Sequence, residues 1–410
     1  MLRSLVRTVF VFAVSVLAAV LGTGAALTTL APGRALLARV LTEESARLVE
    51  GSIRIGGIRD NFLGDLTLDS VVIRDTAGAL LVDASKIEVG YRLGDFLARR
   101  FVFRDARVSD ARLEIVQHRG GRLNYEEIFG LGLPSTDTVK RTKPLVLIED
   151  LALDRAHVTI RLPWNPDGRL RTAAQRDSAL AAERAKPGRR IELAERPGNA
   201  LMIERTLRGL TARFRLLAIS SPDNAPFSMA IDSLTASISD PEITVRDLKA
   251  TLTQGRDSLL FEVERAALPN TIVRGGGRID WPRDTILYNF RLEAPTLDLV
   301  DLRWISPNFP ALRGRGQVTA TSPAGSRSVY DVRDLDVAGD GSRVRGRMVA
   351  MVDVYRGLGF RDLTLDLQSL ELEAVRPFLD TLPLAGRLSG PLQATGLFDA
   401  MPISADWLFQ

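Results

Sequence analysis

The residues best suited to chemistry in this chain are two histidines and a set of recurring aspartates. The histidines are His118 and His157, and the 410 residues include no cysteine. The aspartates recur in the pentapeptide DLTLD, at residues 65–69 and 362–366, and in DLALD at residues 150–154. Imidazole and carboxylate groups bind metal ions and transfer protons, so both sets are candidates for a catalytic or metal site.

The spacing of these residues does not support such chemistry. Neither histidine lies in an H-E-x-x-H pattern or another zinc-ligand spacing, and we expect both to be surface or strand-end residues. The two aspartates of DLTLD would lie about 13 Å apart along a strand, too far for one ion. The glycine run GGGRID at Gly275 lacks the G-x-G-x-x-G spacing that opens a nucleotide-binding helix. We therefore expect no catalytic, metal or cofactor site, and a protein that is not an enzyme.

The composition limits the class of protein further. Hydrophobic residues make up 45% of the chain, but aromatic residues only 6%. The formal net charge is +4, and the basic excess is concentrated in residues 169–208, which hold nine arginines and one lysine against five acidic residues. The remainder is close to neutral, so nothing indicates a nucleic-acid-binding surface.

The N-terminal segment predicts a membrane anchor. No residue between Thr8 and Gly33 is charged, and a helix of this length, at about 1.5 Å per residue, exceeds the ~30 Å hydrocarbon core of a bilayer. Arg3 and Arg7 precede it, which predicts a cytoplasmic N-terminus and an exported remainder. The alternative is a cleaved signal peptide, which would also export the rest. The residues expected to contact the membrane within this anchor are Phe10, Phe12, Val16, Leu17, Val20 and Leu21.

After residue 50 the apolar period changes from helical to two, which predicts strands with one apolar and one charged face. In GDLTLDSVVIRD the phase slips at Ser70, which predicts a bulge. We expect a short helix from Asn124, with Asn124 as its N-cap, and a loop over residues 132–144. The alternating pattern resumes at residue 144, with turn residues every 8–12 positions, which favours an all-β fold over βαβ units. Two further short helices are expected at residues 296–305 and 371–380.

These patterns divide the chain into five segments. They are a transmembrane anchor (1–33), a juxtamembrane helix (34–50), a first strand-rich segment (51–166), a basic insertion (167–207) and a second strand-rich segment (208–410). The insertion is rich in Ala, Arg and Glu and is expected to be helical or mobile. Two interpretations remain open for it: contact with anionic lipid head groups, or a solvated excursion without an apolar face.

The scarcity of aromatic side chains argues against a sandwich of two packed sheets, which needs enough bulk to fill about 10 Å between them. We instead expect an elongated, curled sheet that forms an unfilled groove, with each strand unit contacting its neighbours. The fold class is therefore mainly β, with an N-terminal transmembrane helix, a β-groove and a few short helices. The expected groove-lining residues are Leu66, Leu68, Val89, Tyr91, Phe101, Phe103, Leu113, Ile115, Leu151, Leu153, Val158, Ile160, Phe214, Leu216, Phe290, Leu292, Leu363 and Leu365.

The order of motifs resembles a known family. An anchor helix is followed by G-x-L-x-L-x-x-V-x-I-x-D-x-x-G, then A-x-x-I-x-V-x-Y, then V-x-x-A-R-L-E-I and a short N-Y-E-E-I-F helix, and LPLAGRLSGPLQATG follows from Leu382. This order is similar to that of AsmA-like and TamB-like envelope proteins. The resemblance covers residues 1–165 well and 208–410 loosely. No counterpart is recognised for residues 167–199.

The resemblance implies a single-pass protein of a bacterial inner membrane, with its bulk in the periplasm. It implies that membrane phospholipids are partners, and that the β-groove carries their acyl chains between inner and outer membranes. The alternative is a periplasmic scaffold or chaperone that assists outer-membrane protein assembly by strand augmentation, with an outer-membrane β-barrel protein as partner. Members are usually much longer, so the resemblance indicates either an N-terminal portion or a chain completed by a partner.

Overall fold

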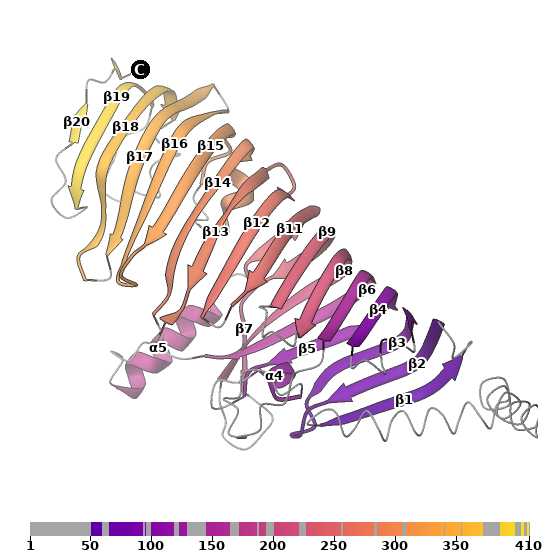
Figure 1. Cartoon of the computed structure of the whole chain (residues 1–410). Coiled ribbons are helices and arrows are strands. Elements are labelled where there is room, and N and C mark those ends of the chain that lie inside the picture. The colour runs from indigo at the N-terminus through magenta and orange to yellow at the C-terminus, as the bar shows by residue number, and fades with distance from the viewer. Residues whose placement is uncertain are drawn as a thin grey trace, which may run out of the picture. The chain divides into compact units, whose positions relative to one another are not determined.

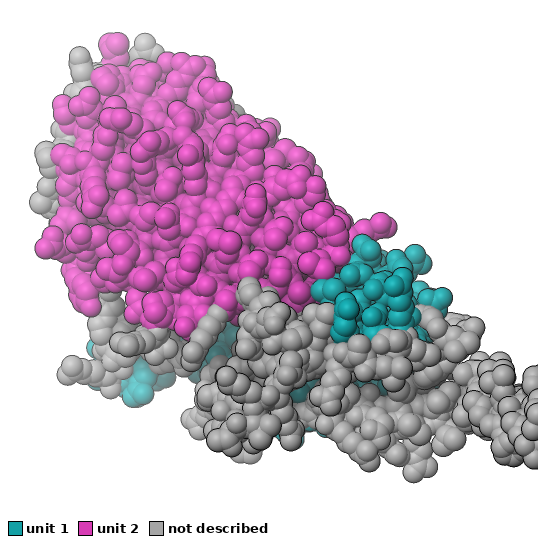
Figure 2. Space-filling model, in the orientation of Figure 1, with its two compact units in different colours: residues 1–211 teal, residues 212–410 magenta. Residues whose placement is uncertain are grey.

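The structure is a computed structural model, and most of its described residues lie in β-strands (Figure 1). It describes residues 51–59, 65–92, 95, 100–118, 123–128, 145–164, 172–186, 188–193, 201–220, 227–255, 257–282, 285–305, 309–339, 341–353, 355–371, 386–397, 403–405 and 408–409. The chain divides into two compact units, residues 1–211 and 212–410, coloured separately in Figure 2. The prediction of a mainly β protein is confirmed.

The first unit contains eight strands and two helices within its described part. Their bounds are β1 Ser52–Arg59, β2 Asp65–Arg74, β3 Leu80–Tyr91, β4 Arg100–Ser109, β5 Arg112–Val116, α4 Asn124–Ile128, β6 Leu145–Pro163, α5 Ala173–Arg184, β7 Arg190–Leu193 and β8 Leu201–Ser220, which continues into the second unit. β1, β2 and β3 form an antiparallel meander, and β3 pairs antiparallel with both β4 and β5. β6 then runs parallel to β4 and to β5.

The second unit is a longer antiparallel meander. Its elements are β9 Phe227–Ser239, β10 Glu242–Val245, β11 Asp247–Gln254, β12 Ser258–Ala267, β13 Ile272–Asp280, β14 Leu287–Asp298, the 3₁₀ helix η2 Leu299–Leu302, β15 Arg313–Ser322, β16 Arg327–Gly339, β17 Ser342–Asp353, β18 Gly357–Glu371, β19 Arg387–Leu397, β20 Ile403–Ala405 and β21 Leu408–Phe409. From β11 to β19 each strand pairs antiparallel with the next. β9 pairs with β11, so ten strands follow one another (Figure 1).

The phase slip at Ser70 has a different cause from the expected bulge. Ser70 has a left-handed backbone, with φ of 52°. The pairing of β2 with β1 and with β3 keeps the same register on both sides of Ser70, so no extra residue is inserted there. Asp105 and Asp150, at equivalent positions of the parallel strands β4 and β6, have φ of 49° and 55°. A left-handed residue interrupts the extended backbone of a strand, and the apolar pattern resumes with Val71 after it.

Three other local expectations are changed by the structure. Asn124 is not an N-cap: it occupies the first helical position of α4, and the carbonyl of Leu123 accepts the hydrogen bond from the Glu127 N–H at 3.1 Å. The helix expected at residues 296–305 is reduced to the single turn η2, because β14 continues to Asp298. The second strand-rich segment begins earlier than residue 208, since β8 starts at Leu201.

The basic insertion contains ordered structure. α5 is an exposed helix whose start is stabilised by a capping box: the Gln175 N–H donates to Thr172 Oγ1, and the Thr172 N–H donates to Gln175 Oε1, both at 3.1 Å. β7 then pairs antiparallel with the start of β8. Within this segment, which was expected to be helical or mobile, residues 173–184 are helical.

Several expectations fall outside the described residues. They concern the anchor (1–33), the juxtamembrane helix (34–50), the loop at 132–144, and the helix at 371–380 beyond Glu371, which ends β18. Within the part of the chain that the structure describes, no helix is both long and apolar enough to cross a membrane.

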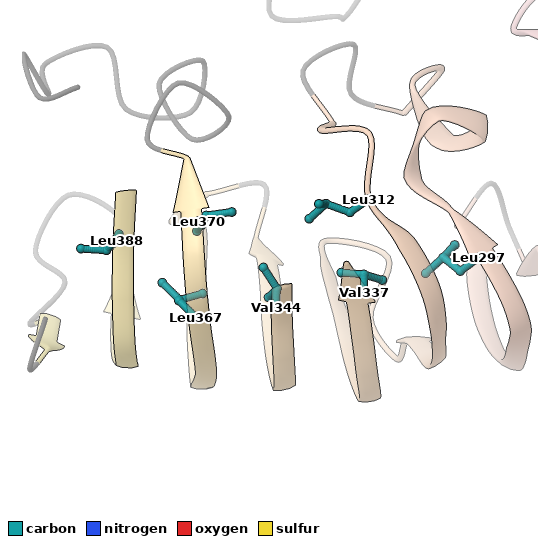
Figure 3. Packing of buried hydrophobic residues seen from close by; sticks show 7 residues of the cluster. All are labelled: Leu297, Leu312, Val337, Val344, Leu367, Leu370 and Leu388. Carbon is teal, nitrogen blue, oxygen red and sulfur yellow. The ribbon is translucent and has the colours of Figure 1, made fainter. Parts of the chain in front are cut away.

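The main core of the second unit lies at one end of its strands. It consists of Leu297, Leu312, Val337, Val344, Leu367, Leu370 and Leu388, which pack together (Figure 3). All lie on strands between β14 and β19 except Leu312, which directly precedes β15. Leu299 and Leu302 of η2 pack against it. The buried Asp298 fixes η2: its Oδ1 accepts from the Val300 N–H at 3.0 Å, and its Oδ2 accepts from Arg313 Nε at 2.7 Å. The core therefore occupies only one end of the sheet.

Ion pairs form on the face of the sheet opposite the core residues. The pairing of Asp336 with two arginines allows a prediction of how stability depends on pH. Asp336 Oδ1 accepts from Arg343 Nε at 2.8 Å and from Arg345 Nε at 3.2 Å. The hydrogen bond from Arg343, followed by that from Arg345, lowers the pKa of Asp336 from 3.8 to about 2. A carboxyl group with a lowered folded-state pKa adds stability above its unfolded pKa, and this contribution is lost as the pH falls through about 2.

We expect Arg343→Gln to return the pKa of Asp336 toward 3.8, because the larger of the two hydrogen-bonding contributions is removed. The measurement is an NMR titration of the carboxyl carbon of Asp336. Arg347→Gln is the control, because Arg347 pairs with Asp362 instead. A wild-type midpoint near 3.8 would contradict the prediction.

Candidate apolar lipid-binding face

The sheet of the second unit carries an uninterrupted apolar face. Side chains that are paired across strands point to the same face. Pairing therefore connects one residue from each of ten strands into what we call the aliphatic row: Ile231, Ala250, Val263, Gly275, Leu292, Val318, Val332, Met348, Leu363 and Ala394. No polar side chain interrupts this row from β9 to β19.

A second row on the same face alternates large and small residues. This aromatic row consists of Met229, Leu252, Phe261, Gly277, Phe290, Ala320, Tyr330, Ala350, Phe360 and Gly396. From β12 onward a ring is followed by a Gly or Ala in every pair of strands. Alternation of size lets large side chains fit beside one another where a continuous line of rings would crowd.

Gly277 demonstrates this fit. The rings of Phe261 and Phe290, on the strands that flank it, have centroids 6.0 Å apart. A Cβ atom at residue 277 would overlap the Cβ of Phe290. Glycine is therefore required at this position for the two rings to approach each other.

The other face of the same sheet is charged. One residue along from the aliphatic row, pairing connects Arg274, Glu293, Gln317 and Arg333. Arg274 Nη2 lies 2.9 Å from Glu293 Oε1, and Arg291 Nη2 donates to Gln317 Oε1 at 2.6 Å. The two faces are thus chemically distinct from β13 to β16.

Among the described residues of the second unit, η2 and the core described above cover the apolar face at one end. Away from that end, most of its large side chains are half-buried, including Phe261, Phe290, Leu292, Val318 and Met348. Val352 and Leu358, which pair at the opposite end, are 40% and 43% exposed. Among the described residues of this unit, no second layer packs over the middle of the face.

Two tyrosines place hydroxyl groups on this face. Tyr288 and Tyr330 join their hydroxyl oxygens in a hydrogen bond of 2.9 Å. Burial, followed by this hydrogen bond, raises the pKa of Tyr330. Tyr330 is therefore neutral at physiological pH. The two hydroxyl groups satisfy each other's hydrogen bonding rather than interrupting the apolar surface.

The first unit has the same two-faced construction. One row of paired residues crosses β1, β2, β3, β5 and β6: Ile53, Ile73, Val82, Leu113 and Val158. A second crosses β2, β3, β4 and β6: Leu68, Ile87, Val108 and Leu153. Burial raises the pKa of Tyr91, which pairs with Phe103 next to this row.

The structure joins many of the residues predicted to line a groove. Direct pairs are Leu66–Val89, Tyr91–Phe103, Leu113–Val158 and Ile115–Ile160, whereas Leu68 and Leu153 share a row, as do Leu292 and Leu363. Phe290 lies in the aromatic row, and Leu365 pairs with Gly346 and Leu392.

Exposure divides these residues into two groups. Tyr91, Leu151, Val158, Phe214 and Leu363 are buried. Leu66, Leu68, Val89, Phe103, Leu113, Ile115, Leu153, Ile160, Leu216, Phe290, Leu292 and Leu365 are half-buried, and the side chain of Phe101 lies outside the described residues.

Sequence reasoning missed the centre of the apolar face, notably Phe261, Val318, Tyr330, Val332 and Met348. Their strands do alternate apolar and polar residues in the sequence. This alternation does not reveal which strands pair with each other. It therefore could not predict that these residues form continuous rows.

The two histidines have different surroundings. His118 follows β5, at the expected strand end, but its Nε2 lies 2.7 Å from Asp75 Oδ2. This contact was not anticipated, because Asp75 and His118 are far apart in the sequence. His157 is half-buried within β6, where it pairs with Arg112.

Fold and surface together define a mainly β protein whose sheets present one apolar and one charged face. No family model, curated protein or solved structure matches the chain.

Proposed function

We propose that this protein binds phospholipids by their acyl chains on the apolar faces of its sheets and transfers them between membranes. The observation that supports this most directly is the combination of the aliphatic and aromatic rows, which cross ten strands and remain half-exposed away from the core. An exposed apolar surface of this extent is unfavourable in water and typically marks a binding surface.

The dimensions suit an acyl chain. Ten strands at about 4.8 Å spacing give a row about 43 Å long. The acyl chains of one leaflet fill about half of a ~30 Å hydrocarbon core, so a row exceeds the length of one chain. Each methylene buried contributes about 0.8 kcal/mol. Because the row offers similar contacts at every strand, a chain can move along it without a deep minimum.

The face has chemistry for the hydrocarbon but not for a polar substrate. The aliphatic row contains no polar side chain, and the tyrosine hydroxyls are paired with each other. The head group would therefore remain in water at the rim of the sheet, while the sheet contacts the acyl chains alone.

The proposed setting follows from the N-terminal sequence. The uncharged segment from Thr8 to Gly33 would anchor the chain in a membrane with its N-terminus in the cytoplasm. The resemblance to AsmA-like and TamB-like proteins implies that this is a bacterial inner membrane. The sheets would then lie in the periplasm and serve as a conduit toward the outer membrane.

Lipid analysis of the full chain tests the proposal. After purification in detergent, bound material is extracted and identified by mass spectrometry. We expect phospholipid to accompany the protein in an amount comparable to the protein itself. Recovery of unfolded outer-membrane protein without phospholipid would overturn the proposal and favour a scaffold that pairs with strands of a client.

A further inference from the structure

Three side chains from separate elements of the first unit converge at the end of β5. Asp75 lies in the turn after β2, His118 follows β5, and Glu127 belongs to α4. His118 Nε2 lies 2.7 Å from Asp75 Oδ2 and 3.9 Å from Glu127 Oε2. One ligand atom from each of the three residues lies within 4.8 Å of the other two.

The position of Asp75 is fixed by its turn. Its side chain has no exposed surface, and its Oδ1 accepts from the Ala79 N–H at 2.7 Å. The Asp75 carbonyl also accepts from the Gly78 N–H at 2.9 Å. Oδ2 is therefore held toward His118 by contacts that do not depend on His118.

Glu127 is positioned by a buried hub, Asn124, at the start of α4. Asn124 is fully buried; its Nδ2 donates to the carbonyls of Leu80 and Glu114 at 3.2 and 2.7 Å, and its Oδ1 accepts from the Val116 N–H at 3.1 Å. These bonds tie α4 to β3 and β5. Glu127, three residues further along α4, is thereby directed to the same point as Asp75 and His118.

We propose that Asp75, His118 and Glu127 form a binding site for a divalent transition-metal ion of the zinc type. Imidazole nitrogen and carboxylate oxygen are both ligands that Zn²⁺ accepts in proteins. Ligand bonds of 2.0–2.2 Å in tetrahedral geometry place donor atoms about 3.4 Å apart. The separations of 2.7 and 3.9 Å lie on either side of that value.

Access and charge favour a bound ion over a simple ion pair. The side chains of His118 and Glu127 are each 23% exposed, so an ion can reach the site and keep water in its fourth position. The Asp75 carboxylate has no exposed surface, and a buried charge requires compensation. The contact with His118 satisfies Asp75 Oδ2 alone, whereas a bound ion would also be coordinated by Glu127 Oε2, which lies 3.9 Å from His118 Nε2.

The ion would have a structural role. It would link the turn after β2, the end of β5 and α4, which lie in three separate parts of the sequence. A metal that binds only the folded state adds its binding free energy to stability. We therefore expect the ion to hold the turn after β2, the end of β5 and α4 together. This inference does not depend on lipid binding.

The amino-acid composition limits binding of Zn²⁺ at other places in the chain. The chain has no cysteine and only one other histidine, His157, so competing strong zinc ligands are few. The full chain, purified in detergent and stripped with EDTA, is titrated with Zn²⁺ by calorimetry, and its thermal unfolding is followed with and without Zn²⁺. We expect one ion per chain and a higher unfolding temperature with Zn²⁺.

Three variants decide the outcome. Losing one of three ligands should weaken binding at least tenfold, so His118→Gln and Glu127→Gln are expected to lose the calorimetric signal and the thermal shift. Glu127→Gln keeps the side-chain size on a half-exposed helix position, so its fold should be preserved. His157→Gln is the matched control and should bind like wild type. Equal Zn²⁺ binding by wild type, His118→Gln and Glu127→Gln would overturn the proposal.

Discussion

Val318→Asp is expected to reduce phospholipid binding at least tenfold. Val318 lies in the middle of the aliphatic row, between Leu292 and Val332, and is half-buried. A carboxylate there must be desolvated when an acyl chain crosses β15, and burial of an unpaired charge costs several kcal/mol. A cost of 1.4 kcal/mol already corresponds to a factor of ten. Phospholipid bound per protein, and transfer between donor and acceptor vesicles, are the measurements.

Thr319→Asp is the matched control for this variant. Thr319 is the next residue of β15 and pairs with Arg291 and Asp331, so it belongs to the charged face. The same charge introduced there should change lipid binding less than twofold. Circular dichroism spectra must show that both variants fold. Equal lipid content in folded Val318→Asp and wild type would exclude the apolar face as the binding surface.

Gly314→Ala is expected to destabilise the second unit by about 3 kcal/mol. A Cβ at residue 314 would overlap the main-chain carbonyl oxygen of Asp336 on the neighbouring strand. A clashing side-chain atom could rotate away. The carbonyl oxygen of Asp336 belongs to the main chain and can move only if β15 and β16 separate. Overpacking of this kind costs about 1–3 kcal/mol. For a unit of this size we expect the unfolding temperature to fall by about 6–12 °C.

Gly316→Ala provides the comparison two residues away on the same strand. The nearest atom to a Cβ there is Leu335 Cδ1 at 3.5 Å, an ordinary contact distance. This substitution should be neutral or stabilise by up to about 1 kcal/mol, because it restricts the unfolded chain. Equal unfolding temperatures for the two variants would show that the close approach of β15 and β16 is not required.

Much of the strand content could be predicted because it is local. Alternation such as Leu66, Leu68 and then Val71 marks one apolar face, and the slip at Ser70 correctly indicated a local irregularity. Its form, a left-handed residue without a register shift, could not be deduced, because a phase change in one strand does not reveal the pairing of its neighbours. The Asn124 prediction failed for a related reason: its side chain binds the backbone of β3, 44 residues away, and of β5, rather than only the start of its own helix.

The groove residues were predicted individually but not as a surface. Leu292 and Leu363 were both expected to be apolar lining, yet only the pairing of five successive strands, β14 to β18, places them in one row. The size alternation of the aromatic row was invisible for the same reason. Its members are separated by different numbers of residues, and each ring has its Gly or Ala partner on another strand.

The sequence by itself determined that the chain is mainly β, that each strand has an apolar and a charged side, and that residues 167–207 depart from this pattern. Those properties depend on residues close together in the chain, whose spacing sets which side chains share a face. Only the tertiary structure decided that the apolar sides join across ten strands, and that Asp75, His118 and Glu127 meet. Both outcomes depend on register between distant segments, which hydrogen bonding and close packing select and which no local spacing encodes.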